Sequence, residues 1–108
     1  MNVLLKRLLH QLDPLLHERG RLAIVSMLAA AASLTFIELR DELQMTDGNL
    51  SVHLQRLEDR GYVNIHKSFV GRKTQTSCQL TVNGRRAFTH YLNQLEAIVQ
   101  EGRSRAGA

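Results

Sequence analysis

Between positions 46 and 61 the sequence places leucines and short polar side chains on opposite sides of a predicted helix. The leucines recur at i, i+4 and i+7, the spacing of one buried helical face: Leu50, Leu54 and Leu57. The polar side carries few large apolar groups and includes Asn49, Ser51, Val52, Gln55 and Arg56. In a DNA major groove, Gln pairs with adenine, Arg with guanine or phosphate, and an apolar group touches the thymine methyl. This side of the helix can therefore read bases.

The ends of the segment also fit a helix. Thr46 can accept a first-turn N–H as the N-cap and lies beside the base-reading side, so we include it among the candidate DNA contacts. Asp47 suits the positive end of the helix dipole, and Gly61 can adopt the positive φ that often follows a helix. Taken alone, the segment fits an ordinary amphipathic surface helix better, so its neighbours decide the interpretation.

A basic β-hairpin is predicted after this helix. Residues 62–69 and 74–80 alternate with a period of two, and the intervening turn holds a glycine and two cations. With Val70 and Gly71 at the tip, Lys67 would face Thr74 across the hairpin. Candidates for contact with the DNA backbone or minor groove are Lys67, Ser68, Arg72, Lys73 and Thr74. The alternative is that the cations only keep an exposed tip soluble.

The segments before residue 46 are predicted to be helices that hold the 46–60 helix in place. We predict an N-terminal amphipathic helix over residues 1–13, a restart at Asp13-Pro14, a break or kink at Gly20 and an apolar core helix over about 21–32. Thr35 and the carboxylate three residues later form a capping box that opens a short helix. A short capped helix, a tight turn and a second helix with a polar outer side predict a helix-turn-helix. A plain helical hairpin in a small bundle is the alternative.

A last helix is predicted over residues 82–101, followed by a disordered tail at 102–108. Its apolar stripe is wider than so small a domain needs on its outside, and with the N-terminal leucines it predicts a symmetric homodimer. The expected interface residues are Leu4, Leu5, Leu8, Leu12, Phe88, Tyr91, Leu92, Leu95, Ile98 and Val99. Alternatively, the two terminal helices pack only on each other within one chain. Whether the first helix packs in its own chain or across the dimer stays open.

Composition narrows the class of protein. The 108 residues suffice for one domain, placed at 1–101, and 14 Lys and Arg against 10 Asp and Glu suit an anionic partner. The single cysteine, Cys78, excludes an internal disulfide and is interpreted as a small core residue. No apolar run approaches the ~20 residues of a membrane span, and the N-terminus lacks signal-peptide features. The cytoplasm is the expected location.

No pattern predicts catalysis, a cofactor or a metal. The sequence contains no phosphate loop, no Ser/His/Asp constellation at a glycine turn and no paired carboxylates in an apolar stretch. The five histidines are scattered over different elements without an i, i+4 pair. His53, at the edge of the leucine side, is predicted to be a half-buried packing residue. We therefore expect a binding protein and not an enzyme.

These elements, in this order, resemble the winged-helix DNA-binding fold, which is mainly α with a small β-hairpin wing (α+β). The runs that are similar to compact regulators related to the MarR and ArsR groups are 21–24, 36–39, 46–54, 57–63, 67–74 and 80–85. The resemblance covers about residues 13–99 and implies a prokaryotic regulator that dimerises through its terminal helices. The ArsR-type cysteine metal signature is missing from the helix-turn-helix, which argues against metal sensing.

The sequence thus predicts a homodimeric transcriptional regulator that binds a pseudo-palindromic operator in double-stranded DNA. The segment 46–60 would lie in the major groove, and the hairpin at 67–74 on the backbone or in the minor groove. The alternative is a winged-helix module for protein–protein contact without a specific DNA site. A small-molecule effector is compatible with either hypothesis, but no residue marks one.

Overall fold

The chain folds into helices and one antiparallel sheet, seen in a computed structural model that describes residues 2–107. In chain order the elements are α1 (Val3–Gln11), α2 (Arg19–Ala30), β1 (Leu34–Thr35), α3 (Phe36–Leu43), α4 (Asp47–Asp59), β2 (Val63–Val70), β3 (Lys73–Leu80) and α5 (Val82–Arg105). The strand order is β1-β3-β2. This is the predicted α+β winged helix-turn-helix, with α3 and α4 as the helix pair and the β2–β3 hairpin as the wing.

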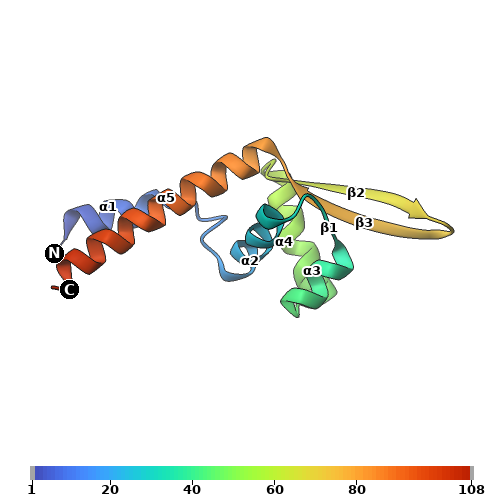
Figure 1. Ribbon diagram of the computed structural model, residues 1–108, viewed down its shortest axis with the longest axis horizontal. Coiled ribbons are helices and arrows are strands. Elements are labelled where there is room, and N and C mark those ends of the chain that lie inside the picture. Colours follow the sequence, from blue (N-terminus) through green and yellow to red (C-terminus); the bar gives the residue numbers. More distant parts are fainter. Residues whose placement is uncertain (1, 108) are drawn as a thin grey trace.

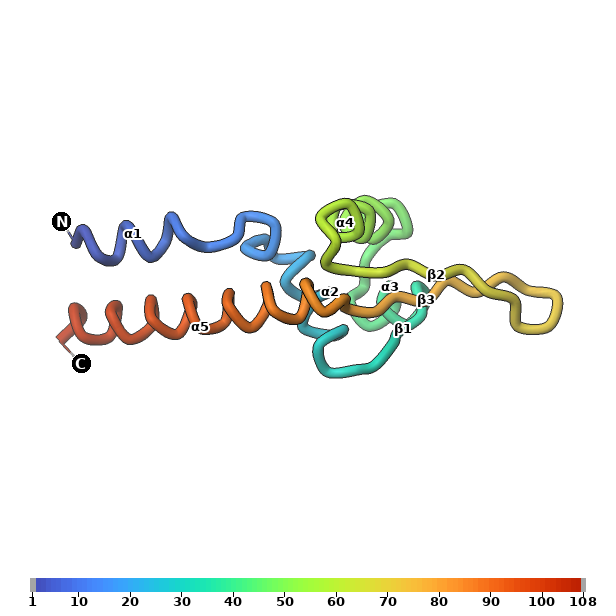
Figure 2. The backbone as a smooth tube through the Cα atoms, turned by 90° about the horizontal axis from the view of Figure 1, so that it is seen from above, coloured from blue at the N-terminus to red at the C-terminus, as the bar shows by residue number. Residues whose placement is uncertain are grey.

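The molecule is elongated, with extents of 60 × 25 × 21 Å. Helices α1 and α5 lie side by side and form an arm at one end, where both chain termini are found (Figure 1). The wing projects from the opposite end, and α2, α3 and α4 lie between arm and wing (Figure 2). The helix-turn-helix is therefore held in the middle of the molecule, next to the base of the wing.

The core forms where α2 meets the helix-turn-helix and the base of the wing. From α2 it contains Ile24, Val25 and Leu28, all fully buried. The leucines predicted to face inward from the second helix are buried as well: Leu50, Leu54 and Leu57. Because this stripe is held against α2 and the sheet, the polar side of α4 must face outward.

The sheet pairs in a register that differs from the prediction. Val70 pairs with Lys73 and Lys67 pairs with Thr76, so the turn consists of Gly71 and Arg72. Gly71 has φ +65°, which suits the first position of a two-residue hairpin turn. The predicted tip was one residue too early, which shifted each strand partner by two positions. A shift of two keeps every side chain on its predicted face.

The helix starts agree with their predicted caps. The Thr35 hydroxyl accepts from the Glu38 N–H at 3.1 Å, and the Glu38 carboxylate accepts from the Thr35 N–H at 3.0 Å, which completes the capping box. The Thr46 hydroxyl accepts from the Asn49 N–H at 3.1 Å. These short-range hydrogen bonds fix the N-terminal ends of both helices of the helix-turn-helix.

The connection between α1 and α2 was predicted less well. Asp13 caps only a single turn, because its carboxylate accepts from the Leu15 N–H at 2.9 Å and the chain then leaves the helical path. Gly20 does not break a helix but lies in the first turn of α2. A Cβ at this glycine would lie 2.8 Å from Nε2 of His53, so a side chain here would require His53 to move.

The last helix is longer than predicted, and the disordered tail is a correction. Helix α5 continues through Gly102 to Arg105, where the prediction ended it at residue 101. Glu101 accepts from Arg105 Nε at 2.9 Å and from Asn2 Nδ2 at 2.7 Å, and cations in the last turn suit the negative end of the helix dipole. These interactions offset the cost of a glycine inside the helix. Ala108 of the predicted tail lies outside the described residues.

Tyr62 joins the helix-turn-helix to the arm. Its N–H donates to the Leu57 carbonyl at 2.9 Å, and its own carbonyl accepts from the Thr81 N–H at 3.0 Å. Gly84, in the first turn of α5, packs so closely on this carbonyl that an added Cβ would lie 2.0 Å from the oxygen. The angle between arm and wing is therefore set by a backbone contact.

In the part of the chain described here, no helix has the length and apolarity needed to cross a membrane.

Replacing Gly84 by Ala should destabilise the fold. The new methyl group collides with the backbone of Tyr62, which cannot rotate away as a side chain would, so we expect a loss of about 1–3 kcal/mol in the free energy of unfolding. Gly102→Ala is the control, because open space surrounds that helical glycine and alanine there should stabilise by roughly 0.5–1 kcal/mol. Urea titration at one protein concentration measures both. A Gly84→Ala variant as stable as the native chain would contradict this account.

Cys78 should resist modification until the protein unfolds. The side chain lies in the core, only 1% exposed. Burial, together with the nearby Glu58 carboxylate, raises the pKa of the thiol to about 11. At pH 8 the native thiol is therefore both inaccessible and protonated, and a thiol reagent such as DTNB should react at the rate of unfolding. Labelling of the folded protein as fast as labelling in urea would show that this packing is wrong.

Candidate nucleic-acid interface

The polar side of α4 is open to solvent. The residues predicted to read bases are all exposed: Asn49, Ser51, Val52, Gln55 and Arg56. Val52 is an apolar side chain left 52% exposed in the middle of this side. Thr46 is exposed at the N-terminal end, with its hydroxyl oxygen engaged as the cap. The structure thus brings the predicted base-reading set together on one convex surface.

Gln55 is held within its own helix. Its Nε2 donates to Oδ1 of Asp59 at 2.9 Å and approaches Oε1 of Glu58 at 3.4 Å. The paired contact with adenine needs both the amide N–H and the amide oxygen of glutamine. Gln55 must therefore exchange its bond to Asp59 for one to a base, and the exchange lowers the net gain from that contact.

A buried polar cluster fixes α4 on α2. Arg21 is 7% exposed, and its guanidinium donates to the Leu15 carbonyl at 2.6 Å and to Nδ1 of His53 at 3.2 Å. Glu18 caps α2 through the N–H groups of Gly20 and Arg21. Burial works to raise the pKa of Glu18, but the hydrogen bonds from these N–H groups and the positive charge of Arg21 lower it overall. His53 is thus the half-buried packing residue that the sequence predicted.

Glu58 anchors the wing to α4, a role that the sequence analysis missed. One carboxylate oxygen accepts from the backbone N–H of Ile65 at 3.2 Å. The bond spans the sharp turn at Gly61, where φ is +81°. An acidic residue in the last turn of a helix, three residues before a glycine and just ahead of a strand, was the available signal. The contact holds the first wing strand against the C-terminal end of α4.

A groove runs between α4 and the wing. It has a volume of about 310 Å³ and is lined by Ser51, Gln55, Lys67 and Thr76, with Leu54, Ile65 and Phe36 at its floor. Val63 and Cys78 are buried on this face of the hairpin, and every second residue along each strand shares it. Lys67, Phe69, Thr74 and Thr76 therefore point to the same side as α4. This shared face makes the helix and the wing one continuous surface.

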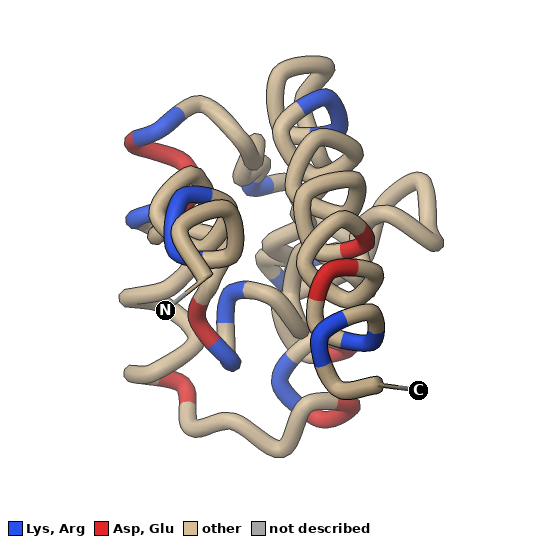
Figure 3. The backbone as a smooth tube through the Cα atoms, turned by 90° about the vertical axis from the view of Figure 1, so that its left-hand side faces the viewer, with Lys and Arg blue, Asp and Glu red and all other residues tan. Residues whose placement is uncertain are grey.

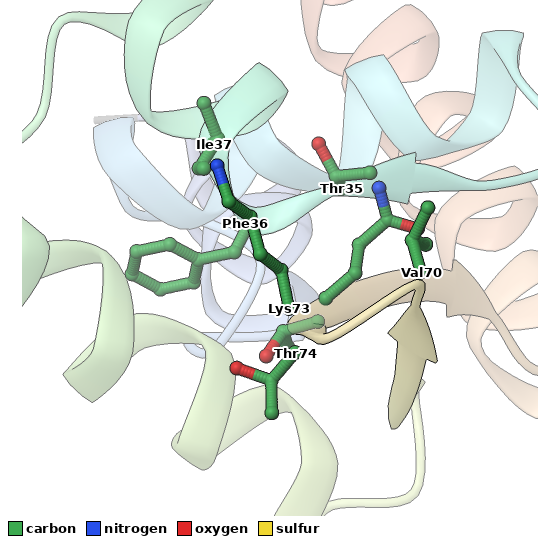
Figure 4. A pocket seen from close by; sticks show the side chains of 8 residues that line it. Thr35, Phe36, Ile37, Val70, Lys73 and Thr74 are labelled. Atoms are coloured by element: carbon green, nitrogen blue, oxygen red, sulfur yellow. The ribbon is translucent and has the colours of Figure 1, made fainter.

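A second hollow lies on the α3 side of the wing. It measures about 440 Å³ and lies between the start of α3 and strand β3. The Lys73 side chain extends from β3 toward Ile37, and Val70 lies across the hollow near Thr35 (Figure 4). Ile37 and Val70 are 58% and 61% exposed, so this hollow is shallow. The remaining predicted wing contacts, Arg72 and Ser68, are exposed at the tip and half-buried, respectively.

The charge of the chain is unevenly distributed. From Arg60 to Leu95 there is no Asp or Glu, while the same stretch carries Arg60, Lys67, Arg72, Lys73, Arg85 and Arg86. The wing and the start of α5 are thus purely cationic. At the C-terminal end of α5, in contrast, acidic and basic residues are mixed (Figure 3). The positive charge that suits a polyanion is therefore concentrated beside α4.

The arm contains both buried and exposed members of the predicted dimer set. Leu12 and Tyr91 are 6% and 1% exposed and pack in the core of their own chain, so neither belongs to the outer face. Five others are half-buried: Leu5, Leu8, Phe88, Leu95 and Ile98. Three are 45–47% exposed: Leu4, Leu92 and Val99. Helix α1 packs along α5 of the same chain, and Gln94 Nε2 donates to the Gln11 carbonyl at 3.0 Å.

Several titratable side chains form hydrogen bonds that join elements of the fold. Within residues 2–107 no three His, Cys, Asp or Glu side chains come close enough to hold a metal ion. His17 Nδ1 pairs with the hydroxyl of Tyr91 at 2.7 Å, and the Tyr62 hydroxyl donates to Asp13 at 2.6 Å. Both hydrogen bonds join the α1–α2 connection to other elements, so these side chains stabilise the fold.

Comparison with known proteins agrees with this geometry. A family model described as a winged helix DNA-binding domain matches residues 21–99. An uncharacterised protein of Methanocaldococcus jannaschii is 35% identical over 75 residues, which cover 69% of this chain and 82% of that protein. The match to the family model begins at the buried Arg21 and includes α4, the wing and most of α5.

Solved structures share the architecture. A transcriptional regulator homologue from Pyrococcus horikoshii superposes with a TM-score of 0.81 at 27% identity, over 90% of this chain and 94% of that one. A mutant MarR from E. coli superposes with a TM-score of 0.69 at 23% identity, over 91% and 70%. Overoxidised AbfR bound to DNA superposes with a TM-score of 0.69 at 18% identity, over 86% of this chain and 65% of that one. The protein described here belongs to the family of winged helix DNA-binding domains.

Proposed function

We propose that this protein is a cytoplasmic transcriptional regulator that binds a specific site in double-stranded DNA as a homodimer. The observation that carries the proposal is the exposed polar side of α4. Its apolar stripe is fixed in the core by Leu50, Leu54 and Leu57, and a wing without acidic residues flanks it. A helix presented in this way fits the major groove, which is about 12 Å wide.

In this proposal α4 reads the bases. Asn49, Ser51 and Val52 lie toward the N-terminal half of the helix, where the dipole favours an approach to DNA. Gln55 and Arg56 lie one turn further on, and Arg56 is free to reach a guanine or a phosphate. Asp59, which accepts the Gln55 amide, lies at the helix end, where a shallow approach keeps it away from phosphates.

The wing supplies the contacts to the backbone. Lys67 lines the groove beside Ser51 and Gln55, so it would contact the phosphates that border the major groove. Arg72 and Lys73 would contact the next backbone or the minor groove beyond it. The hydroxyl groups of Thr46, Ser68 and Thr74 can each donate one hydrogen bond to a phosphate oxygen. These contacts give affinity and register, and the α4 contacts give sequence preference.

The arm would form the dimer. Helix α1 has no buried residue, and only Gly84 and Tyr91 are buried in the whole of α5. Apolar side chains on the outside of the arm include Val3, Leu4, Leu9, Leu92 and Val99, each 45–69% exposed. A second copy related by a two-fold axis would cover them and would present two α4 helices to successive major grooves about 34 Å apart. A palindromic site follows from this symmetry.

Arg72→Ala and Gln55→Ala should weaken DNA binding in different ways. On a duplex enriched from random sequence, Arg72→Ala should lose affinity for the enriched and a scrambled duplex alike, and should reduce the slope of log K against log salt by about 1 per wing. Gln55→Ala should lose roughly 5- to 100-fold on the enriched duplex only. Fluorescence anisotropy at several salt concentrations separates the two effects.

Arg103→Ala is the control for this pair, since it removes the same charge at the far end of the arm. It should change neither affinity nor salt slope. If Arg72→Ala lost affinity only for the enriched duplex, Arg72 would not be a contact to the DNA backbone. An equal loss on both duplexes for Gln55→Ala would argue against base reading and would favour a protein-docking role for the domain.

Leu92→Asp with Val99→Asp should separate the dimer. Both side chains lie one above the other on the outside of α5, seven residues apart, so a symmetric contact buries both. Two carboxylates without partners there should weaken association more than tenfold, measured by sedimentation equilibrium. Ile37→Asp, an equally drastic change at an exposed site on α3, should leave association unchanged. A native chain that sediments as a monomer would refute the dimer.

A further inference from the structure

We propose that Phe69, near the tip of the wing, enters the DNA minor groove as an apolar wedge and opens a base step. This inference rests on the proposed function and adds a residue that the base-reading and phosphate-contacting sets do not contain. Phe69 is 76% exposed, more than any other large apolar side chain in residues 2–107. The ring is therefore available to a partner that the wing approaches.

The register of the hairpin places Phe69 on the DNA-facing side. Phe69 pairs with Thr74, and this pair follows Val63–Leu80, Ile65–Cys78 and Lys67–Thr76 along one face of the two strands. The inner members of that series pack under α4, and Lys67 lines the groove beside it. Phe69 is therefore the outermost side chain on the surface that begins with the base-reading helix.

The distance from α4 also fits. Phe69 lies four positions beyond Ile65, which packs beside α4, and four steps of an extended strand span roughly 14 Å. The middle of a major groove and the middle of the next minor groove are separated by half of each width, roughly 9 Å, plus the backbone between them. A wing that follows α4 across this backbone brings Phe69 to the minor groove.

The surrounding charge identifies the occupant as a polyanion. Lys67 shares the face of the Phe69 ring, Arg72 lies in the turn, and Lys73 pairs with Val70 on the other face. No acidic residue occurs anywhere in the wing. An apolar protein surface would gain nothing from three cations in the wing. DNA, in contrast, offers phosphates on both sides of the apolar gap between two neighbouring bases. Inserted apolar side chains are a known means of kinking DNA at a base step, and pyrimidine–purine steps open most easily.

The test uses the full-length protein and a duplex enriched from random sequence, with 2-aminopurine placed at successive positions in each flank. Binding should raise the fluorescence at one position in each flank, because the base there loses its stacking. Phe69→Ala should abolish this rise and weaken binding about tenfold, the usual loss for one base–aromatic contact. Phe69→Leu, which keeps an apolar wedge, should retain most of the rise.

Val70→Ala is the matched control. Val70 is the next residue, is 61% exposed and points to the opposite face of the hairpin, so its removal should leave the fluorescence rise intact. The proposal is overturned if the native protein binds without any rise or if Phe69→Ala retains it. It is also overturned if Phe69→Ala changes the sedimentation of the free protein, since Phe69 would then contact a second copy. Failure to enrich any duplex would instead refute the proposed function itself.

Discussion

Four parts of the molecule meet at Tyr62. Its N–H bonds the end of α4, its carbonyl bonds the N–H of Thr81 before α5, and its hydroxyl donates to Asp13 in the α1–α2 connection. Burial and the Asp13 carboxylate raise the pKa of the Tyr62 hydroxyl, so it remains a donor at neutral pH. Since β2 begins at the next residue, α4, the wing and the arm are all joined here. A dimer built on the arm can hold two α4 helices at a defined spacing only while this joint is rigid.

The joint is supported by polar contacts on both sides. Arg21 and His53 hold α4 on α2, and Glu58 holds β2 on α4. Each of these groups is charged or polar and lies inside or at the edge of the core, where an unpaired polar group would cost stability. No buried side-chain N or O atom in the described chain lacks a partner. The helix and the wing therefore act as one rigid surface, with a cationic wing beside a polar helix whose acidic residues lie at its two ends.

Local chemistry made much of this architecture predictable. The Thr35–Glu38 capping box, the Thr46 cap and the spacing of the three leucines on α4 are short-range features, and the structure contains all of them. The contacts that orient the elements are long-range and escaped the sequence: Asp13 with Tyr62 lie 49 positions apart, and Arg21 with His53 lie 32 apart. The polar side of α4 was predictable, but the bond between Gln55 and Asp59 was not, because either side chain had other possible partners. From the sequence, Gly102 resembles the end of a helix. The hydrogen bonds from Arg105 and Asn2 to Glu101 explain why the helix continues past it.

The central claim is that two copies of one rigid surface read a symmetric DNA site. Selection of bound duplexes from a random-sequence pool, followed by sequencing, tests it most directly. The account predicts enrichment of an inverted repeat whose half-site centres lie about 10 base pairs apart, one helical turn of DNA. A single unrepeated motif would show that the protein binds without two-fold symmetry. A pool without any enriched motif would contradict sequence reading by α4 altogether.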